Sequence, residues 1–167
     1  MSVTGQLPDV GDTEALGRGL ARLLRAGDLV VLSGELGAGK TALTRGIGSG
    51  LGVRGAVTSP TFVIARVHPS VGAGPALVHV DAYRLADLAE VDDLDLDASL
   101  AESVTVVEWG SGKVDALAAD RLEVTLHRGD DVADETRTVV VRGVGSRWSA
   151  AWGELEALMR TTSLGQD

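Results

Sequence analysis

The 167-residue sequence contains no cysteine and no asparagine, and only 3% of its residues are aromatic. The absence of cysteine excludes disulfide bonds, thiolate metal sites and cysteine nucleophiles. The absence of asparagine excludes the Asn-Lys-x-Asp motif with which GTPases read guanine. Because 44% of the residues are nevertheless hydrophobic, the core must consist mainly of Val, Leu and Ala.

Positive charge is also scarce, and the net charge is -9. This argues against a broad surface for a nucleic-acid backbone, because phosphate contacts need clustered Lys and Arg. No apolar run approaches membrane-spanning length, and the N-terminal segment carries Asp9 and Asp12 instead of a basic region followed by an apolar one. These features predict a soluble cytoplasmic protein without membrane contact, in which another subunit would hold any RNA.

One segment matches a phosphate-binding loop. Residues 34–41 read Gly-Glu-Leu-Gly-Ala-Gly-Lys-Thr, which fits G-x-x-x-x-G-K-[ST], and they follow a strand-like run at 29–33. Gly37 and Gly39 would let successive backbone N–H groups point at phosphate oxygens. A helix that begins here would direct the positive end of its dipole at the anion. The segment therefore predicts nucleotide binding, against the alternative of a glycine-rich turn that matches by chance.

The composition supports a specific role for Lys40. The chain has 13 arginines and only two lysines, so a generic positive charge would be expected to be Arg. A lysine stands where the loop needs a compact ammonium group. We expect Lys40 to lie between the outer phosphates of the nucleotide and the Thr41 hydroxyl to bind magnesium.

Hydrophobic periodicity predicts a single α/β domain over residues 1–160 and a loose tail from about Thr161. The expected helices are one capped by Asp12 and ended by Gly27, one that begins after the loop and ends near Gly52, and one that begins near Trp148. The expected strands are residues 29–33, 62–67, 76–80 and 104–107, followed by an antiparallel hairpin at 121–127 and 136–142. Together these elements predict a P-loop NTPase-type three-layer fold with a mixed, largely parallel central sheet and the hairpin as an addition.

Two predicted inner strands end in carboxylates. Asp81 follows the run at 76–80, and Glu108 follows the run at 104–107. The carboxyl ends of parallel strands are where open α/β sheets place ligands, so both side chains would face the phosphates. Asp81 is the Walker B candidate, and Glu108 could bind magnesium or position the attacking water. Trp109 could stack in the site, although packing is the more common role of such a residue.

Four segments together resemble the TsaE (YjeE) family, small bacterial ATPases that support threonylcarbamoylation of the adenosine beside the tRNA anticodon. Besides the loop at 34–41, they are Ser-Pro-Thr-Phe at 59–62, His-Val-Asp-Ala-Tyr-Arg-Leu at 79–85 and Glu-Trp at 108–109. Their order is that of the family and their spacing is similar. The departures, Glu35 for the frequent Asp and Ala42 for the frequent second Thr, remove no required donor.

The resemblance implies a role for each matching residue. ATP would be bound by Thr13 near the base and, at the phosphates, by Glu35, Leu36, Gly37, Ala38, Gly39, Lys40 and Thr41. Magnesium would be bound by Thr41 and Glu108 with support from Asp81, and catalysis would depend on Lys40, Asp81 and Glu108. Ser59, Pro60 and Thr61 would form a switch-like segment. The resemblance also implies TsaD and TsaB as protein partners, tRNA contact only through them, and hydrolysis that resets the complex.

Alternatives remain open at this stage. A small-molecule kinase could use the same loop, but it would need an acceptor pocket and usually an Arg-bearing lid. A nucleotide-gated binding module is a third hypothesis. The acidic stretch at 87–102 is interpreted as a solvated face or as a partner surface. His68, His79 and His127 lack metal-ligand spacing, so we interpret them as structural.

Overall fold

The computed structural model describes residues 1–59, 65–84, 100–109, 111–112, 114, 118–129 and 134–163. The strands are β1 (Ser2–Leu7), β2 (Leu29–Ser33), β3 (Ala65–His68), β4 (Ala76–Asp81), β5 (Ser103–Glu108), β6 (Arg121–Arg128) and β7 (Arg137–Val144). The helices are α1 (Val10–Ala21), α2 (Lys40–Leu51), α5 (Ser146–Ala150) and α6 (Trp152–Ser163), and a 3-10 turn, η1 (Ala82–Arg84), follows β4.

The strands form one mixed sheet in the order β1-β7-β6-β2-β5-β4-β3. β2 runs parallel to both β5 and β6, and β4 runs parallel to β5, so the centre of the sheet is parallel. β6 and β7 pair antiparallel as a hairpin, and the edge strands β1 and β3 are antiparallel to their neighbours. The predicted largely parallel centre and the added hairpin are confirmed.

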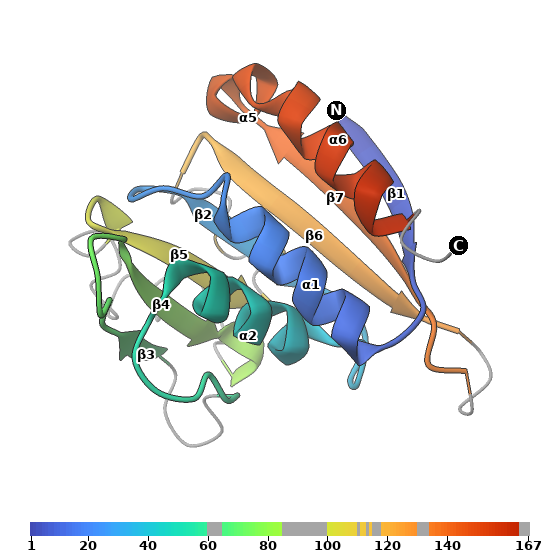
Figure 1. The fold of residues 1–167 in the computed structure, drawn as a ribbon, viewed down its shortest axis with the longest axis horizontal. Coiled ribbons are helices and arrows are strands. Elements are labelled where there is room, and N and C mark those ends of the chain that lie inside the picture. Colours follow the sequence, from blue (N-terminus) through green and yellow to red (C-terminus); the bar gives the residue numbers. More distant parts are fainter. Residues whose placement is uncertain are drawn as a thin grey trace.

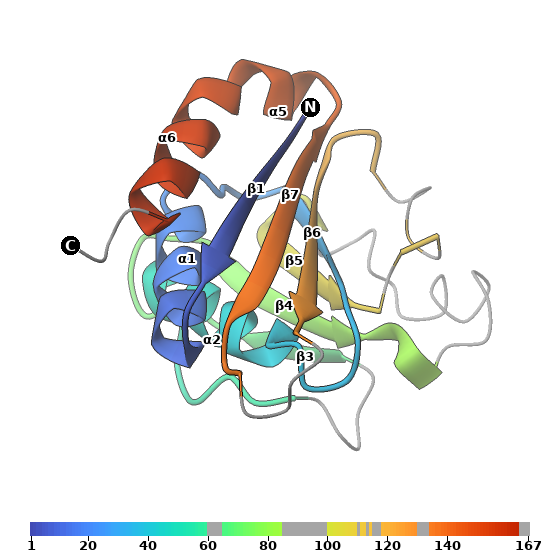
Figure 2. The ribbon, with the colours of Figure 1, turned by 90° about the vertical axis from the view of Figure 1, so that its right-hand side faces the viewer.

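The helices α1, α2 and α6 cover one face of this sheet (Figures 1 and 2). Beneath them lies the larger apolar core, which includes Leu16, Leu43, Val106 and Leu155. The opposite face carries a smaller apolar cluster around Val31, Val80 and Val107. The described residues do not test the third layer of the predicted fold.

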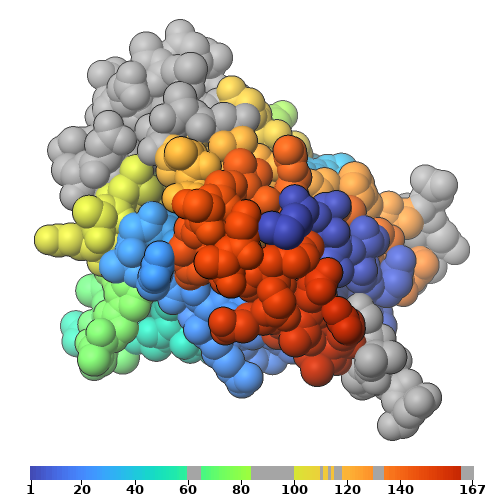
Figure 3. All heavy atoms as spheres, turned by 90° about the horizontal axis from the view of Figure 1, so that it is seen from above, coloured from blue at the N-terminus to red at the C-terminus, as the bar shows by residue number. Residues whose placement is uncertain are grey.

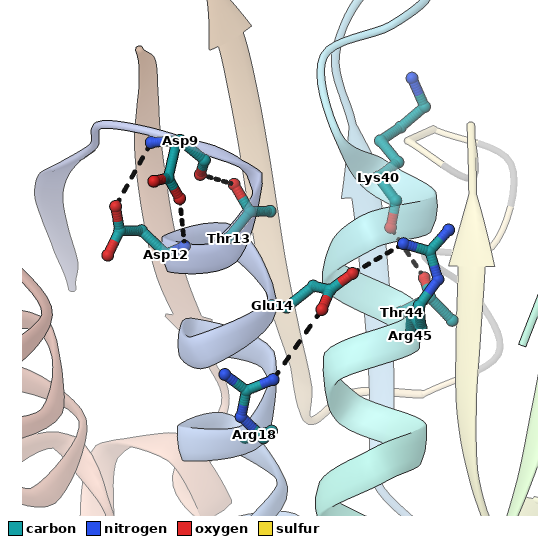
Figure 4. Close-up of polar contacts among 8 residues, drawn as sticks. All are labelled: Asp9, Asp12, Thr13, Glu14, Arg18, Lys40, Thr44 and Arg45. Atoms are coloured by element: carbon teal, nitrogen blue, oxygen red, sulfur yellow. Dashed lines mark hydrogen bonds and ion pairs between the residues drawn. The ribbon is translucent and has the colours of Figure 1, made fainter. Parts of the chain in front are cut away.

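Close packing holds α2 against α1. A Cβ atom at Gly17 would overlap the Leu43 carbonyl oxygen, and one at Gly46 would overlap the carbonyl oxygen of Glu14. These glycines weaken a helix intrinsically, but they allow the two backbones to touch. Figure 4 shows Glu14 of α1 reaching across to Arg45 of α2, with 2.7 Å between Oε1 and Nη1. The start of α1 is therefore fixed beside the start of α2.

The N-terminus of α1 differs from the prediction. Asp9 is the N-cap, and its Oδ1 accepts a hydrogen bond from the backbone N–H of Asp12 at 2.9 Å. Asp12 lies inside the first turn, and its Oδ2 accepts from the N–H of Asp9 at 3.3 Å (Figure 4). The predicted N-cap at Asp12 was wrong because both residues form a reciprocal capping box. The predicted end at Gly27 was also wrong, since the helix ends at Ala21.

Both ends of the chain contain elements that the sequence did not predict. β1 pairs with β7 and packs against α6, and Figure 3 shows the N-terminal strand beside the C-terminal helices on one face. The expected terminal helix is divided into α5 and α6 at Ala151. α6 continues through Ser163, into the segment predicted to be a loose tail, and residues 164–167 lie outside the described structure.

Several sequence predictions cannot be placed. Pro60, Thr61 and most of the acidic stretch at 87–102 lie outside the described residues. Of the strand expected at 62–67, the described part belongs to β3. Among the described residues, no helix is long and apolar enough to cross a membrane.

Candidate functional site

The predicted phosphate-binding loop joins β2 to α2 at the carboxyl edge of the parallel centre. Gly34, Gly37 and Gly39 have φ values of 138°, 78° and 107°, which residues other than glycine rarely adopt. Gly39 is the N-cap of α2, and no side chain caps the first turn there. The N–H groups of that turn therefore provide an anion-binding position at the positive end of the helix.

Lys40 is folded back against its own loop. Its Nζ donates hydrogen bonds to the carbonyl oxygens of Gly34 at 2.8 Å and Glu35 at 2.9 Å. The residue is only 5% exposed. Burial lowers the pKa of Lys40, while the nearby carboxylates of Glu108, Glu35 and Asp81 act in the opposite direction. The ammonium group thus lies within the loop, held by two backbone carbonyl oxygens.

The two predicted carboxylates lie side by side. The parallel register of β4 and β5 pairs Asp81 with Glu108, and that of β2 and β5 pairs Leu32 with Glu108. Asp81 is half-buried, and its Oδ1 accepts from the backbone N–H of Tyr83 at 3.0 Å. Parallel strands whose carboxyl ends share one edge bring these groups to the loop, as the sequence predicted.

Glu108 contacts the loop helix directly. The Thr41 hydroxyl donates to its Oε1 at 3.2 Å, and Nε2 of His79 lies 2.8 Å from the same oxygen. Glu108 is only 3% exposed, and a buried carboxylate is tolerated when it is hydrogen-bonded in this way. Of the two predicted carboxylates, Glu108 rather than Asp81 therefore makes the contact with Thr41.

Trp109 closes one side of the site. Its φ of 61° makes it the only described residue other than glycine with a positive φ, a conformation that such residues adopt only where the surroundings enforce it. The Nζ of Lys40 lies 3.9 Å from the centre of its indole ring, and the ring of Tyr83 is 5.2 Å away at 57°. The indole thus lines the cleft in contact with Lys40 and Tyr83, and it belongs to neither of the two core clusters.

These residues line a cleft of about 440 Å³. Its walls are formed by the loop, the end of β4, the end of β5 and Ser59, the described residue of the predicted switch-like segment. Leu36 and Tyr83 also line it and are 85% and 68% exposed. The cleft has room for the outer phosphates of a nucleotide with a hydrated cation.

A second, smaller pocket of about 120 Å³ lies on the other side of the loop. It shares Gly37 and Gly39 with the large cleft, and it is also lined by Thr13 of α1 and Arg137 of β7. Thr13 is buried, and its hydroxyl donates to the Asp9 carbonyl at 3.1 Å (Figure 4). A nucleotide that extended from one pocket to the other would therefore cross the loop with its phosphates.

Glu35 anchors the loop to the hairpin. Its side chain accepts a hydrogen bond from the backbone N–H of Arg128, and this bond is the main cause of the lowered pKa of Glu35. The guanidinium of Arg128 also lies beside the loop, where a Cβ at Gly37 would be 3.6 Å from its Nη1. The end of β6 thus brings a second cation to the loop.

The donor set suits magnesium better than a closed metal site. In the part of the chain that the structure describes, no three His, Cys, Asp or Glu side chains form a metal-binding group. Thr41, Glu108 and Asp81 provide hard oxygen atoms on one side of the cleft. Magnesium is usually held by one or two carboxylates, water and substrate phosphates, so these residues fit that ion when phosphates complete the shell.

Sequence reasoning missed three residues of this site. His79 was interpreted as structural, although its position two residues before Asp81 on one strand places both side chains on the same face. Tyr83 belongs to the segment of resemblance at 79–85 but was given no role. Arg128 gave no local signal, because only the pairing of β6 with β2 brings it to the loop.

Comparisons with known proteins point in one direction. The family model described as "Threonylcarbamoyl adenosine biosynthesis protein TsaE" matches residues 7–139. The protein of Streptomyces coelicolor named tRNA threonylcarbamoyladenosine biosynthesis protein TsaE is 70% identical over 138 residues, which cover 81% of this chain and 93% of that protein. The Bacillus subtilis protein of the same name is 36% identical over 86% of this chain and 87% of its own.

A solved structure agrees with the fold. The crystal structure of Bacillus subtilis YdiB matches with a TM-score of 0.72 and 27% sequence identity, and the match covers 96% of this chain and 95% of that one. The likeness thus extends over nearly the whole length of both chains.

Proposed function

Because this chain belongs to the TsaE family, we propose that it is an ATPase that supports the formation of threonylcarbamoyladenosine in tRNA. The relatives named for this biosynthesis match most of the chain. The observation that carries the proposal is the hydrogen bond from Thr41 to Glu108, 3.2 Å long. It joins the first turn of the loop helix to a strand-end carboxylate, and P-loop NTPases hold magnesium with a loop hydroxyl and a strand-end carboxylate.

The nucleotide proposed for this site is ATP. Its phosphates would lie against the loop N–H groups of residues 35–41, and its base would lie toward Thr13 in the smaller pocket. Lys40 would leave the carbonyl oxygens of Gly34 and Glu35 for the outer phosphates, since both partners are neutral and a phosphate is charged. Arg128 would add a second positive charge beside the loop.

Magnesium is the proposed cation, held by Thr41 and Glu108 with Asp81 in support. When bound, it would neutralise charge on the outer phosphates and so favour hydrolysis. The two carboxylates would also orient the attacking water at the edge where Asp81 and Glu108 are paired. Trp109 and Tyr83 would limit access of bulk water to that edge.

The proposed role in tRNA modification is indirect. The net charge of -9 does not favour contact with a phosphate backbone. We therefore assign tRNA binding and carbamoyl transfer to the partners TsaD and TsaB. In this scheme the ATP-bound chain associates with that pair, and slow hydrolysis resets the complex between cycles.

Substitution of Glu108 tests the ATPase proposal. Phosphate release with magnesium should fall by at least about tenfold in Glu108→Ala, while thermal denaturation still shows a folded protein. Glu123→Ala is the matched control, because that carboxylate also forms ion pairs but does not line the cleft. Wild-type turnover in the Glu108 variant would remove this residue from the mechanism. ATP consumption only with a small acceptor would favour the kinase alternative.

A further inference from the structure

A buried histidine contacts the site carboxylate from within the sheet. His79 lies on β4 and is completely buried, and its Nε2 is 2.8 Å from Oε1 of Glu108. The register pairs Asp81 with Glu108. Because side chains alternate along a strand, His79 and Asp81 face the same side of the sheet as Glu108. The imidazole therefore contacts Glu108 from the buried interior, next to the proposed magnesium-binding edge.

The contact assigns the proton to one ring nitrogen when Glu108 is ionised. A carboxylate oxygen can only accept, so Nε2 of His79 is then the donor to Glu108. Nδ1 is buried and has no hydrogen-bond partner in the described part of the chain. The bond to Glu108 is thus the one that orients this imidazole among the described residues.

Both hydrogen bonds to the carboxylate reach the same oxygen. The Thr41 hydroxyl donates to Oε1 at 3.2 Å, as Nε2 of His79 does at 2.8 Å. No described residue donates to Oε2, and Glu108 lines the cleft. One oxygen is therefore held against the protein while the other is left to the cleft.

We infer that His79 is a positioning residue for the ATPase reaction, which fixes Oε1 of Glu108 so that Oε2 faces the magnesium ion or the attacking water. This inference rests on the proposed function. Partners that orient a metal-binding carboxylate typically change metal affinity or activity by about 10- to 100-fold when they are removed. His79 acts through Glu108 and touches no phosphate in this scheme.

His68 provides a matched control. It is 4% exposed, and it pairs with Leu77 in the register of β3 and β4. Its Nε2 also has no hydrogen-bond partner among the residues that the structure describes. It faces the same side of the sheet as His79, but it makes no contact with Glu108. Replacement of either histidine disturbs a buried imidazole, whereas only one replacement removes the bond to the carboxylate.

The kinetic test compares His79→Leu, His79→Gln and His68→Gln over a magnesium titration. In His79→Leu we expect turnover to fall by about 10- to 100-fold and the half-saturating magnesium concentration to rise. The affinity for ATP without magnesium should stay within about twofold of the wild type, because the loop is intact. His79→Gln should recover most of the turnover, since its amide N–H can replace the lost donor. His68→Gln should match the wild type.

A spectroscopic measurement distinguishes a failure of this inference from a failure of the proposed function. In ¹⁵N-histidine NMR spectra, His79 should show a protonated Nε2 whose signal shifts in Glu108→Gln, while the His68 signals remain unchanged. The inference is overturned if His79 shows no such coupling, if folded His79 variants turn over as the wild type does, or if His68→Gln falls equally far. The absence of ATP hydrolysis by the wild type, with the NMR coupling present, would instead overturn the proposed function.

Discussion

Buried polar side chains are distributed unequally between the two halves of the sheet. The site half, defined as β2 to β5 with α1, α2 and their connections, contains all of the described ones, among them Lys40, His79 and Glu108. The scaffold half, defined as β1, β6, β7, α5 and α6, buries hydrophobic side chains such as Leu126 and Leu155, together with the indole N–H of Trp148, which has no hydrogen-bond partner among the described residues. Buried side chains with charged or hydrogen-bonding groups thus lie mainly in one half of a single continuous sheet.

This difference indicates where stability originates. Buried polar groups contribute little net stability, because their hydrogen bonds replace bonds to water. The charged side chains of the scaffold half are half-buried or exposed, as in the pairs of Glu123 with Arg121 and Arg142, and solvent-exposed ion pairs contribute about 0 to 1 kcal/mol each. One ion pair between the halves joins Asp28 to Arg147 of α5, at 3.0 Å. Stability should therefore come from the apolar core that both halves share, while the buried polar groups of the site half serve the ligand together with Arg128 of β6.

The strongest test of this division is Leu155→Ala in α6. Leu155 is completely buried, so the truncation should lower the free energy of unfolding by about 2–5 kcal/mol. ATP affinity, measured by calorimetry where the variant is fully folded, should remain within about twofold of the wild type. Urea denaturation gives the first quantity, with Glu154→Ala as a surface control. A parallel loss of affinity would mean that the two halves are not separable.

Lys40→Ala should produce the opposite pattern. Loss of the loop ammonium should weaken ATP binding by about 100-fold, or about 3 kcal/mol, because charge-assisted bonds to phosphate are lost. The free energy of unfolding should change by less than about 1 kcal/mol, since the lysine contacts only carbonyl oxygens and a ring face. Arg160→Ala, at an exposed ion pair, is the control. Unchanged affinity in calorimetry would refute the loop assignment.

Two glycine substitutions compare the halves directly. Gly34→Ala should lower the free energy of unfolding by about 1–3 kcal/mol, because φ is 138° and the new Cβ would overlap the Leu126 carbonyl. Gly153→Ala in α6 meets no atom within 4 Å and should raise it by about 0.5–1 kcal/mol. Thermal denaturation measures both changes. The same sign for the two variants would contradict the strain assigned to the loop.

The smallest expected effect is a pH dependence of the free energy of unfolding, which arises from His68 in the site half. Burial is the main cause that lowers the pKa of His68 below its usual value of 6.5, with help from nearby His79. As the pH falls below about 6.5, the unfolded chain therefore takes up the proton first, and the free energy of unfolding decreases. His68→Gln should lose less stability over this window in urea denaturation. Equal slopes for the two proteins would show that the pKa of His68 is the same in the folded and the unfolded state.

Much of the fold could be predicted because its signals are local. The loop motif, the carboxylates at 81 and 108 and the hairpin each lie in one short run whose pattern identifies the element. The positive φ of Gly39 and Gly52 agrees with the predicted start and end of α2. The glycines inside α2 could be recognised as weak helix formers, but their contacts with α1 could not be read from the sequence.

The remainder depends on tertiary contacts. β1 exists because β7 offers a free edge, and Arg128 reaches the loop only through strand pairing. Asp9 and Asp12 are both good capping residues, and the sequence did not reveal that they act together. The role inferred for His79 needs the register of β4 and β5. Local propensity specifies elements, whereas the register between them specifies which side chains meet.

The most direct test of the proposed function is repeated-turnover threonylcarbamoyl transfer to tRNA by the purified TsaD and TsaB pair, with and without this chain. ATP is compared with a non-hydrolysable analogue, and Lys40→Ala is included. We predict that multiple turnovers require both this chain and hydrolysable ATP, and that Lys40→Ala abolishes them. Equal turnover without the chain, by a partner pair shown to be active, would contradict the proposal.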